Sequence, residues 1–178
     1  MNSIKPIIIL LPIIILIITG ILFFTLLKKA TDKQIFKRYI FTVIVVSFLL
    51  NLAWELIQLP LYKNAAYSFN HIAFCVLATI ADVLMVLLLY FGFALIFKNL
   101  FWIQHIKLQQ VVIVVLISGA GAVLSEMRHL SLRSWAYDDS MPLVPLANVG
   151  ISPVLQFMFL PLFIYKLSFY FSKNKIVQ

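Results

Sequence analysis

The stretch NLAWELIQLPLY, residues 51–62, carries polar side chains within a strongly apolar part of the chain. Asn51, Glu55, Gln58 and Tyr62 follow one another at steps of four, three and four residues. Such steps keep side chains on one face of an α-helix. The spacing therefore predicts a helix with one polar stripe. On it, Glu55 can exchange a proton, and Asn51 and Gln58 can form hydrogen bonds.

Residues 71–82 repeat this arrangement further along the chain. His71, Cys75, Thr79 and Asp82 follow at steps of four, four and three residues, so they also share one helix face. At about 1.5 Å per residue, Asp82 would lie about 16 Å along the helix from His71. A helix that begins at the membrane surface would therefore carry Asp82 to about the middle of the membrane.

Two later apolar stretches add polar groups on the same side of the membrane. Ser118 and Glu126 lie in the stretch 110–127, and Gln156 lies near the start of 149–171. We expect two polar layers in one half of the membrane. The shallow layer holds Glu55, Gln58, His71, Glu126, Arg128 and His129, and the deeper layer holds Asn51, Asp82, Ser118 and Gln156. Ionisable side chains within a membrane face protein or water, and by default they indicate a functional site.

Carboxyl groups and histidine in a poorly hydrated cavity are typical of general acid–base catalysis. Glu55 and Glu126 are the expected acid–base pair, and Asp82 would orient the reacting group from below. The predicted catalytic residues are Glu55, Glu126, Asp82 and His71. The predicted substrate-binding residues are Asn51, Gln58, Trp54, Arg128, Trp135, Tyr137 and Gln156.

These residues also have a purely structural interpretation. A hydrogen bond between Asn51 and Asp82 would lock two helices together. Glu126 could form a salt bridge with Arg128 or Arg133. Tryptophan and tyrosine side chains are common anchors at the membrane interface. The sequence leaves these alternatives open.

Motifs for metals and cofactors are sparse. Glu126 and His129 form a single E-x-x-H unit, whereas a di-iron bundle needs two such units and further glutamates. Cys75 is the only cysteine, so it forms neither an internal disulfide nor a cysteine-based metal motif. The sequence also lacks G-x-S-x-G, P-loop and dinucleotide-binding motifs. We predict no metal site, and the sequence does not identify a cofactor.

The chain as a whole has 178 residues, of which 63% are hydrophobic and 11% are charged. A soluble domain could not cover its surface with so few polar groups. Five apolar runs have about the 20 residues that span a bilayer as a helix, namely 6–27, 40–60, 71–97, 110–127 and 149–171. We predict an all-α, polytopic membrane protein. It would form a single domain, residues 1–178, with about five transmembrane helices and an outer loop at 128–148.

The basic residues are divided unevenly between the two ends of these helices. Ten lie in the loops 28–39 and 98–109 and near the C-terminal end, and four lie at the opposite end. Lysine and arginine concentrate on the cytoplasmic side of membrane proteins. We therefore expect a multi-pass protein of the bacterial inner membrane, with the N-terminus outside and the C-terminus in the cytoplasm. The net charge of +8 is then a topology signal and a contact for anionic lipid, not a nucleic-acid interface.

Three functional hypotheses fit this pattern. The first is a membrane-embedded enzyme that acts on a hydrophobic small molecule, a lipid or an isoprenoid-like substrate, by acid–base chemistry. The second is a non-catalytic accessory subunit whose polar stripes bind the helices of a membrane-protein partner. The third is a proton-coupled carrier, against which the odd number of helices and the apolar inner half argue. Membrane lipids are expected partners in every case.

Topology can be tested with fusion reporters. A reporter after the C-terminus should be active in the cytoplasm, and a reporter at Ser68 should be active outside, because the uneven charge orients the chain. A cytoplasmic signal at Ser68 would contradict an outward-facing site.

Overall fold

The computed structural model describes residues 6–173, which form helices and loops without a strand. The long helices are α1 (Pro6–Lys29), α2 (Lys33–Gln58), α3 (Phe69–Ile96), α4 (Leu108–Ser131) and α5 (Ile151–Lys173). Two short 3-10 helices, η1 (Leu59–Leu61) and η2 (Trp102–His105), follow α2 and α3. The all-α prediction is confirmed.

Each of the five α-helices is long and apolar enough to cross a membrane. Large apolar side chains cover their outer surfaces. For example, Ile57 on α2 is 78% exposed, and Leu77 on α3 and Leu124 on α4 are 65% and 67% exposed. Continuous apolar surfaces of this kind suit contact with lipid rather than with water. The prediction of five such helices is confirmed.

Helix α2 begins earlier than expected, at Lys33 rather than at residue 40. The reason is the side chain of Asp32, whose Oδ1 accepts hydrogen bonds from the backbone N–H groups of Gln34 at 2.8 Å and Ile35 at 2.9 Å. A carboxylate in this position satisfies donors that the first helical turn leaves unpaired. The basic residues at the start of α2 are therefore helical.

Helix α4 is also longer than expected and continues to Ser131. Arg128 and His129, which were expected in the loop, belong to its last turn. No proline or glycine interrupts residues 128–131, whereas Pro142 and Pro145 prevent a helix further on. The loop between α4 and α5, called here the α4–α5 loop, therefore covers residues 132–150. The bounds of α1, α3 and α5 lie within two residues of the expected ones.

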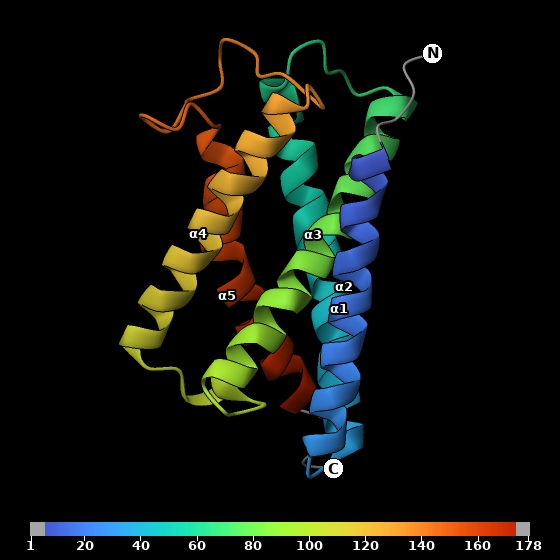
Figure 1. Ribbon diagram of the computed structural model, residues 1–178, viewed down its shortest axis with the longest axis vertical. Coiled ribbons are helices and arrows are strands. Elements are labelled where there is room, and N and C mark those ends of the chain that lie inside the picture. Colours follow the sequence, from blue (N-terminus) through green and yellow to red (C-terminus); the bar gives the residue numbers. More distant parts are fainter. Residues whose placement is uncertain (1–5, 174–178) are drawn as a thin grey trace.

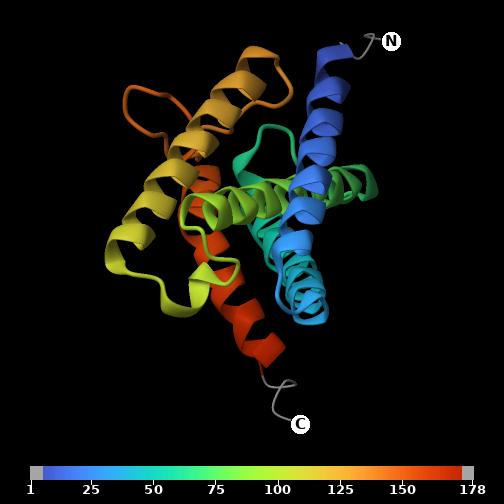
Figure 2. The same ribbon diagram turned by 60° about the horizontal axis from the view of Figure 1, so that its bottom comes forward.

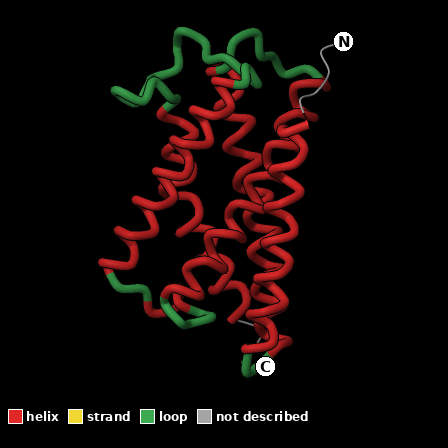
Figure 3. Tube along the Cα trace, viewed as in Figure 1, coloured by secondary structure: helices red, strands yellow, loops and turns green. Residues whose placement is uncertain are grey.

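The helices alternate in direction, so that their connections gather at two ends (Figure 1). The α2–α3 and α4–α5 loops lie at the upper end in Figure 3, together with the start of α1. Helix α2 packs mainly on α5 and α3, while α4 packs mainly on α5 and α1 on α3. The centre is therefore formed by α2, α3 and α5, with α4 and α1 on opposite flanks (Figure 2).

An aromatic core fills the lower half of this centre. It consists of Tyr39 on α2, Tyr90 on α3, Trp102 on η2 and Tyr165 on α5, all of them buried. Tyr90 lies 5.2 Å from both Tyr39 and Tyr165 and 5.7 Å from Trp102, measured between ring centroids. Their polar atoms bond to backbone carbonyls, as when the Tyr165 hydroxyl donates to the Val86 carbonyl at 2.6 Å. Buried aromatic rings with hydrogen-bonded polar tips therefore fill this half of the bundle.

The hydroxyl of Tyr165 provides a test of this core. Tyr165→Phe keeps the ring and removes the donor to Val86, so we expect the free energy of unfolding to fall by about 1 kcal/mol. Tyr170→Phe is the matched control, because Tyr170 lies on the same helix and is 60% exposed. Thermal melts of both purified variants make the comparison. Equal melting temperatures would contradict a role for this hydrogen bond.

Candidate functional site

The side-chain amide of Gln156 on α5 joins the two central helices that flank it. Its Nε2 donates to Oδ1 of Asn51 on α2 at 3.0 Å and to Oδ2 of Asp82 on α3 at 3.2 Å. Gln156 and Asn51 are each only 1% exposed. Asn51 and Asp82 therefore meet through a glutamine from the last helix, not by the direct hydrogen bond considered for them.

Gln58 extends this network toward the upper end. Its Nε2 donates to Oε1 of Glu55 at 2.7 Å and to Oε1 of Gln156 at 3.4 Å. Its own Oε1 accepts the hydroxyl of Ser152 at 2.9 Å. The carboxyl groups of Glu55 and Asp82 are thus connected through two glutamine side chains.

Every amide in the network has a defined orientation. The nitrogen of Asn51 donates to the backbone carbonyl of Ser47 at 2.8 Å and to its hydroxyl at 2.9 Å, so its oxygen faces Gln156. Each amide nitrogen meets acceptors only, and each amide oxygen meets a donor, in the bonds made by Asn51, Gln58 and Gln156. Complete pairing of this kind is what buried polar groups require. It holds the Glu55 and Asp82 carboxyl groups in place as acceptors.

Glu126 is held by the α4–α5 loop. Its side chain is 7% exposed, and its Oε2 accepts hydrogen bonds from the Trp135 indole at 3.2 Å and from the Tyr137 hydroxyl. The loop in turn pairs with the end of η1, where the N–H of Lys63 donates to the carbonyl of Ala136 at 2.9 Å. Glu126 is therefore covered by a loop whose backbone is hydrogen-bonded to the segment that follows η1.

The carboxyl groups of Glu55, Asp82 and Glu126 are named here the carboxyl cluster, because they lie close enough to interact electrostatically. The structure thus brings together three of the four predicted catalytic residues. Tyr62, just beyond η1, is close enough to interact electrostatically with all three of them. Burial raises the pKa of the Tyr62 hydroxyl, and the neighbouring Glu126 and Glu55 raise it further. Tyr62 therefore stays a neutral hydrogen-bond donor at physiological pH.

The pKa of the Tyr137 hydroxyl is raised in the same way as that of Tyr62. Burial raises its pKa first, and its hydrogen bond to Glu126 raises it further. A neutral phenol can keep donating to a carboxylate. Trp135 and Tyr137, predicted to bind substrate or to anchor the chain at the interface, are thus hydrogen-bonded to Glu126 itself.

His71 lies outside the carboxyl cluster. Its Nδ1 is 3.2 Å from the backbone N–H of Ala66, 3.0 Å from the carbonyl of Ala66 and 3.1 Å from the hydroxyl of Ser68. These contacts hold the loop that precedes α3. Among residues 6–173, His71 makes no hydrogen bond to Glu55, Asp82 or Glu126, so its catalytic role has no support from the geometry.

Five buried side-chain polar atoms have no hydrogen-bond partner within the described chain. Three of them belong to Trp54 on α2, Thr79 on α3 and Ser118 on α4. Thr79 is fully buried and Ser118 is 2% exposed. The sequence analysis placed Thr79 and Ser118 among the polar residues of their helices and predicted Trp54 to bind substrate, but it gave no reason to single out the two hydroxyls. Arg128, the remaining predicted binding residue, is half-buried in the last turn of α4.

The E-x-x-H unit does not form a metal site in the described part of the chain. His129 stacks on Trp135 with ring centroids 4.3 Å apart, and its Nδ1 is 3.3 Å from the Ser134 hydroxyl. Across residues 6–173, no three side chains of histidine, cysteine, aspartate or glutamate are grouped to hold an ion. The cluster offers acids and amides for proton chemistry and hydrogen bonding.

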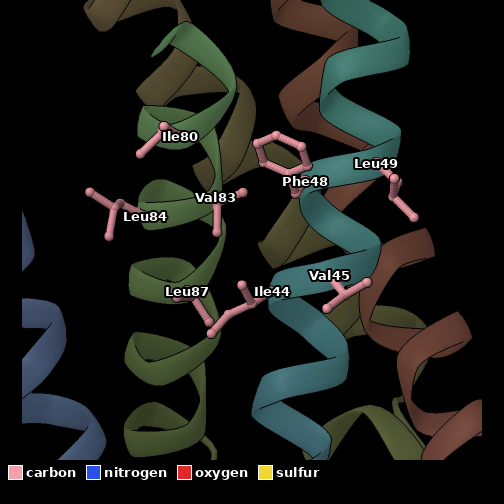
Figure 4. Close-up of a pocket in the computed structure, with 8 residues that line it drawn as sticks. All are labelled: Ile44, Val45, Phe48, Leu49, Ile80, Val83, Leu84 and Leu87. Carbon is pink, nitrogen blue, oxygen red and sulfur yellow. The ribbon is translucent and has the colours of Figure 1, made fainter. Parts of the chain in front are cut away.

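An apolar groove of about 410 Å³ runs between α2 and α3 (Figure 4). It is lined by Ile44, Val45, Phe48, Leu49, Ile80, Val83, Leu84 and Leu87. All eight side chains are hydrocarbon, so the groove can hold an apolar chain but supplies no reactive group.

No protein-family model, curated protein or solved structure matches this chain.

Asp82 offers a test of the hydrogen-bond network. Asp82→Leu removes one acceptor of Gln156, and we expect the variant to lose about 0.6–2 kcal/mol of stability, the scale of hydrogen bonds between helices in membranes. Asp82→Asn keeps an acceptor of the same shape and should lose less. Thermal melts in detergent would measure both. Unchanged melting and unchanged function in Asp82→Leu would contradict this role.

Proposed function

We propose that the protein is a membrane-embedded enzyme that acts by acid–base chemistry on a lipid or isoprenoid-like substrate. The observation that carries this proposal is the grouping of Glu55, Asp82 and Glu126 at one end of an otherwise apolar bundle. Three carboxyl groups are costly to insert into a membrane. A purely structural role would need only some of them.

The donors around the cluster support proton exchange. Glu55 accepts from an amide, and Glu126 accepts from an indole and a phenol. Neutral donors favour the carboxylate form less strongly than a cation in an ion pair would, so the carboxyl group remains able to take up and release a proton. Glu55 and Glu126 act as the acid–base pair in this proposal, and Asp82 orients Gln156 and the network from below.

The apolar groove supports the class of substrate. Its residues adjoin the polar network in sequence, since Leu49 precedes Asn51 on α2 and Val83 follows Asp82 on α3. A hydrocarbon tail in the groove would have its polar end at the level of the network. Burial of each methylene group of such a tail contributes about 0.8 kcal/mol.

The two other hypotheses receive less support. A proton-coupled carrier needs a polar path through both halves, but the aromatic core of Tyr39, Tyr90, Trp102 and Tyr165 fills the lower half. An accessory subunit that binds partner helices through its polar stripes needs those stripes on its surface. Gln58 and the other amides of the network are buried inside the bundle instead.

The membrane arrangement is part of the same proposal. Most of the lysine and arginine residues lie on helix ends and in the α3–α4 connection, at the end opposite to the carboxyl cluster. With the basic end in the cytoplasm, the cluster opens toward the outer side of a bacterial inner membrane. Its substrate would then enter from the outer leaflet.

Glu55→Gln tests the proposed chemistry. Glutamine preserves the shape and hydrogen bonding of Glu55 but exchanges no proton near neutral pH. We expect function in a complementation assay to be abolished while the thermal melt of the purified variant stays nearly unchanged. Full complementation by Glu55→Gln would refute the acid–base role and favour the accessory-subunit hypothesis.

Asn51→Leu supplies the contrasting variant. It removes the acceptor that Gln156 uses on α2 and touches no titrating group. We expect a loss of about 0.6–2 kcal/mol of stability, with activity retained by the protein that remains folded. Loss of activity in fully folded Asn51→Leu would mean that the network, not proton exchange, limits function.

A further inference from the structure

The α4–α5 loop ends in a short hairpin, residues 143–150, which we call the tip hairpin. Leu143 and Gly150 pair as an isolated antiparallel bridge. Inside this bridge, the N–H of Val144 donates to the carbonyl of Val149 at 2.7 Å. Backbone hydrogen bonds therefore give the end of the loop a defined shape.

The base of the tip hairpin is packed closely on the helices. Val149 is fully buried and belongs to one hydrophobic cluster with Ala122 of α4 and Val154 of α5. Met141, just before the hairpin, is also buried, and its Sδ would lie 2.9 Å from a Cβ added at Gly150. These contacts fix the direction in which the hairpin leaves the bundle.

The turn of the tip hairpin carries a leucine where the backbone favours another residue type. Leu146 has a φ of 69°, and its side chain is fully exposed. A positive φ is rare for a bulky residue, whereas asparagine adopts it more readily, as Asn148 does with a φ of 51°. Neither the backbone nor packing within the described chain explains the leucine. A strained residue that persists in this way indicates a functional constraint.

The tip hairpin lies in a long stretch without charge. Residues 140–165 contain no acidic, basic or histidine side chain. Asp138 and Asp139, which come just before this stretch, are both exposed. Leu143 and Pro145 are exposed on the hairpin itself. The exposed side chains change from charged to mainly apolar within a few residues, as they would where a chain passes from water into a membrane interface.

The tip hairpin projects sideways from the bundle at the start of α5 (Figures 1 and 2). The turns of α4 and α5 at this end also expose apolar side chains, among them Leu124, Met127 and Leu155. These helices are long and apolar enough to cross a membrane. A hairpin directed sideways from their ends would meet the same lipid that surrounds them.

We propose that the tip hairpin is embedded in the lipid interface at this end of the bundle, with Leu143 and Leu146 among the acyl chains just below the headgroups. Apolar side chains exposed together mark membrane contacts, and interfacial segments bury their apolar side by about 5–10 Å. The hairpin then anchors the α4–α5 loop, which carries Trp135 and Tyr137 onto Glu126. The inference shares with the proposed function the placement in a membrane, and it is independent of the acid–base chemistry.

Fluorescence quenching of the full chain in nanodiscs tests the inference. Leu146→Cys and Asp139→Cys are each labelled with a thiol-reactive bimane, and two quenchers are compared, lipid with brominated acyl chains and iodide in the water. We expect brominated lipid to quench the label at position 146 and iodide to quench the label at position 139. The wild-type protein, whose only cysteine, Cys75, is buried, provides the blank.

Leu77→Cys is the positive control, because Leu77 is an exposed apolar residue of α3. Lipid quenching at position 77 together with iodide quenching at position 146 would overturn the inference and leave the membrane placement intact. Quenching at position 146 by neither agent would show that protein covers the tip, and it would also overturn the inference. If lipid quenches neither position, the membrane placement fails together with the inference.

Two substitutions of Leu146 locate the anchor, with the label placed at Leu143→Cys in both. Leu146→Asn suits the positive φ but is polar, so lipid quenching at position 143 should fall and iodide quenching should rise. Leu146→Met is the matched control, since it keeps an apolar side chain of similar volume, and quenching should stay unchanged. Equal quenching in the two variants would overturn the inference. Thermal melts verify folding, and full complementation by Glu55→Gln with a lipid-quenched tip would refute the proposed chemistry alone.

Discussion

Hydrogen bonding of polar groups inside an apolar bundle is the constraint on which the structure depends. The amide of Gln156 on α5 satisfies this constraint for three helices at once. It donates hydrogen bonds to Asn51 on α2 and Asp82 on α3, and it accepts one from Gln58 on α2. In hydrocarbon no water can replace a lost partner. A shift of one of these helices along its axis would therefore leave several groups unpaired. The network fixes the relative heights of α2, α3 and α5.

The same three helices are fixed a second time by the aromatic core. Tyr39, Tyr90 and Tyr165 come one from each helix, and the Tyr165 hydroxyl reaches the backbone of α3. The two sets of contacts differ in chemistry. Directional hydrogen bonds position the upper half, and close aromatic packing closes the lower half. The carboxyl cluster can thus lie at one end of the bundle while the other end stays filled by side chains.

Helical periodicity explains how much the sequence could predict. Steps of three and four residues placed Asn51 and Gln58 on one helix face, which is buried in the structure, and hydropathy located five apolar helices. Periodicity does not determine which faces meet. It could not foresee that Gln156 would lie between Asn51 and Asp82. His71 shares the spacing of Asp82, but it lies near the start of α3, where loop backbone groups satisfy its ring.

The position of the α4–α5 loop could not be predicted in this way, because no periodic pattern relates the loop to the carboxyl cluster. Helix α4 packs mainly on α5, and an added Cβ at Gly119 would lie 2.8 Å from Cγ of Met158, so these two helices are in close contact. Helix α4 is consequently positioned by α5, and Glu126 near its end accepts hydrogen bonds from Trp135 and Tyr137 of the loop. Displacement of this loop would remove two hydrogen bonds from Glu126 and uncover it at the same time. Access to the carboxyl cluster and the hydrogen bonding of one of its acids are therefore coupled through the same two side chains.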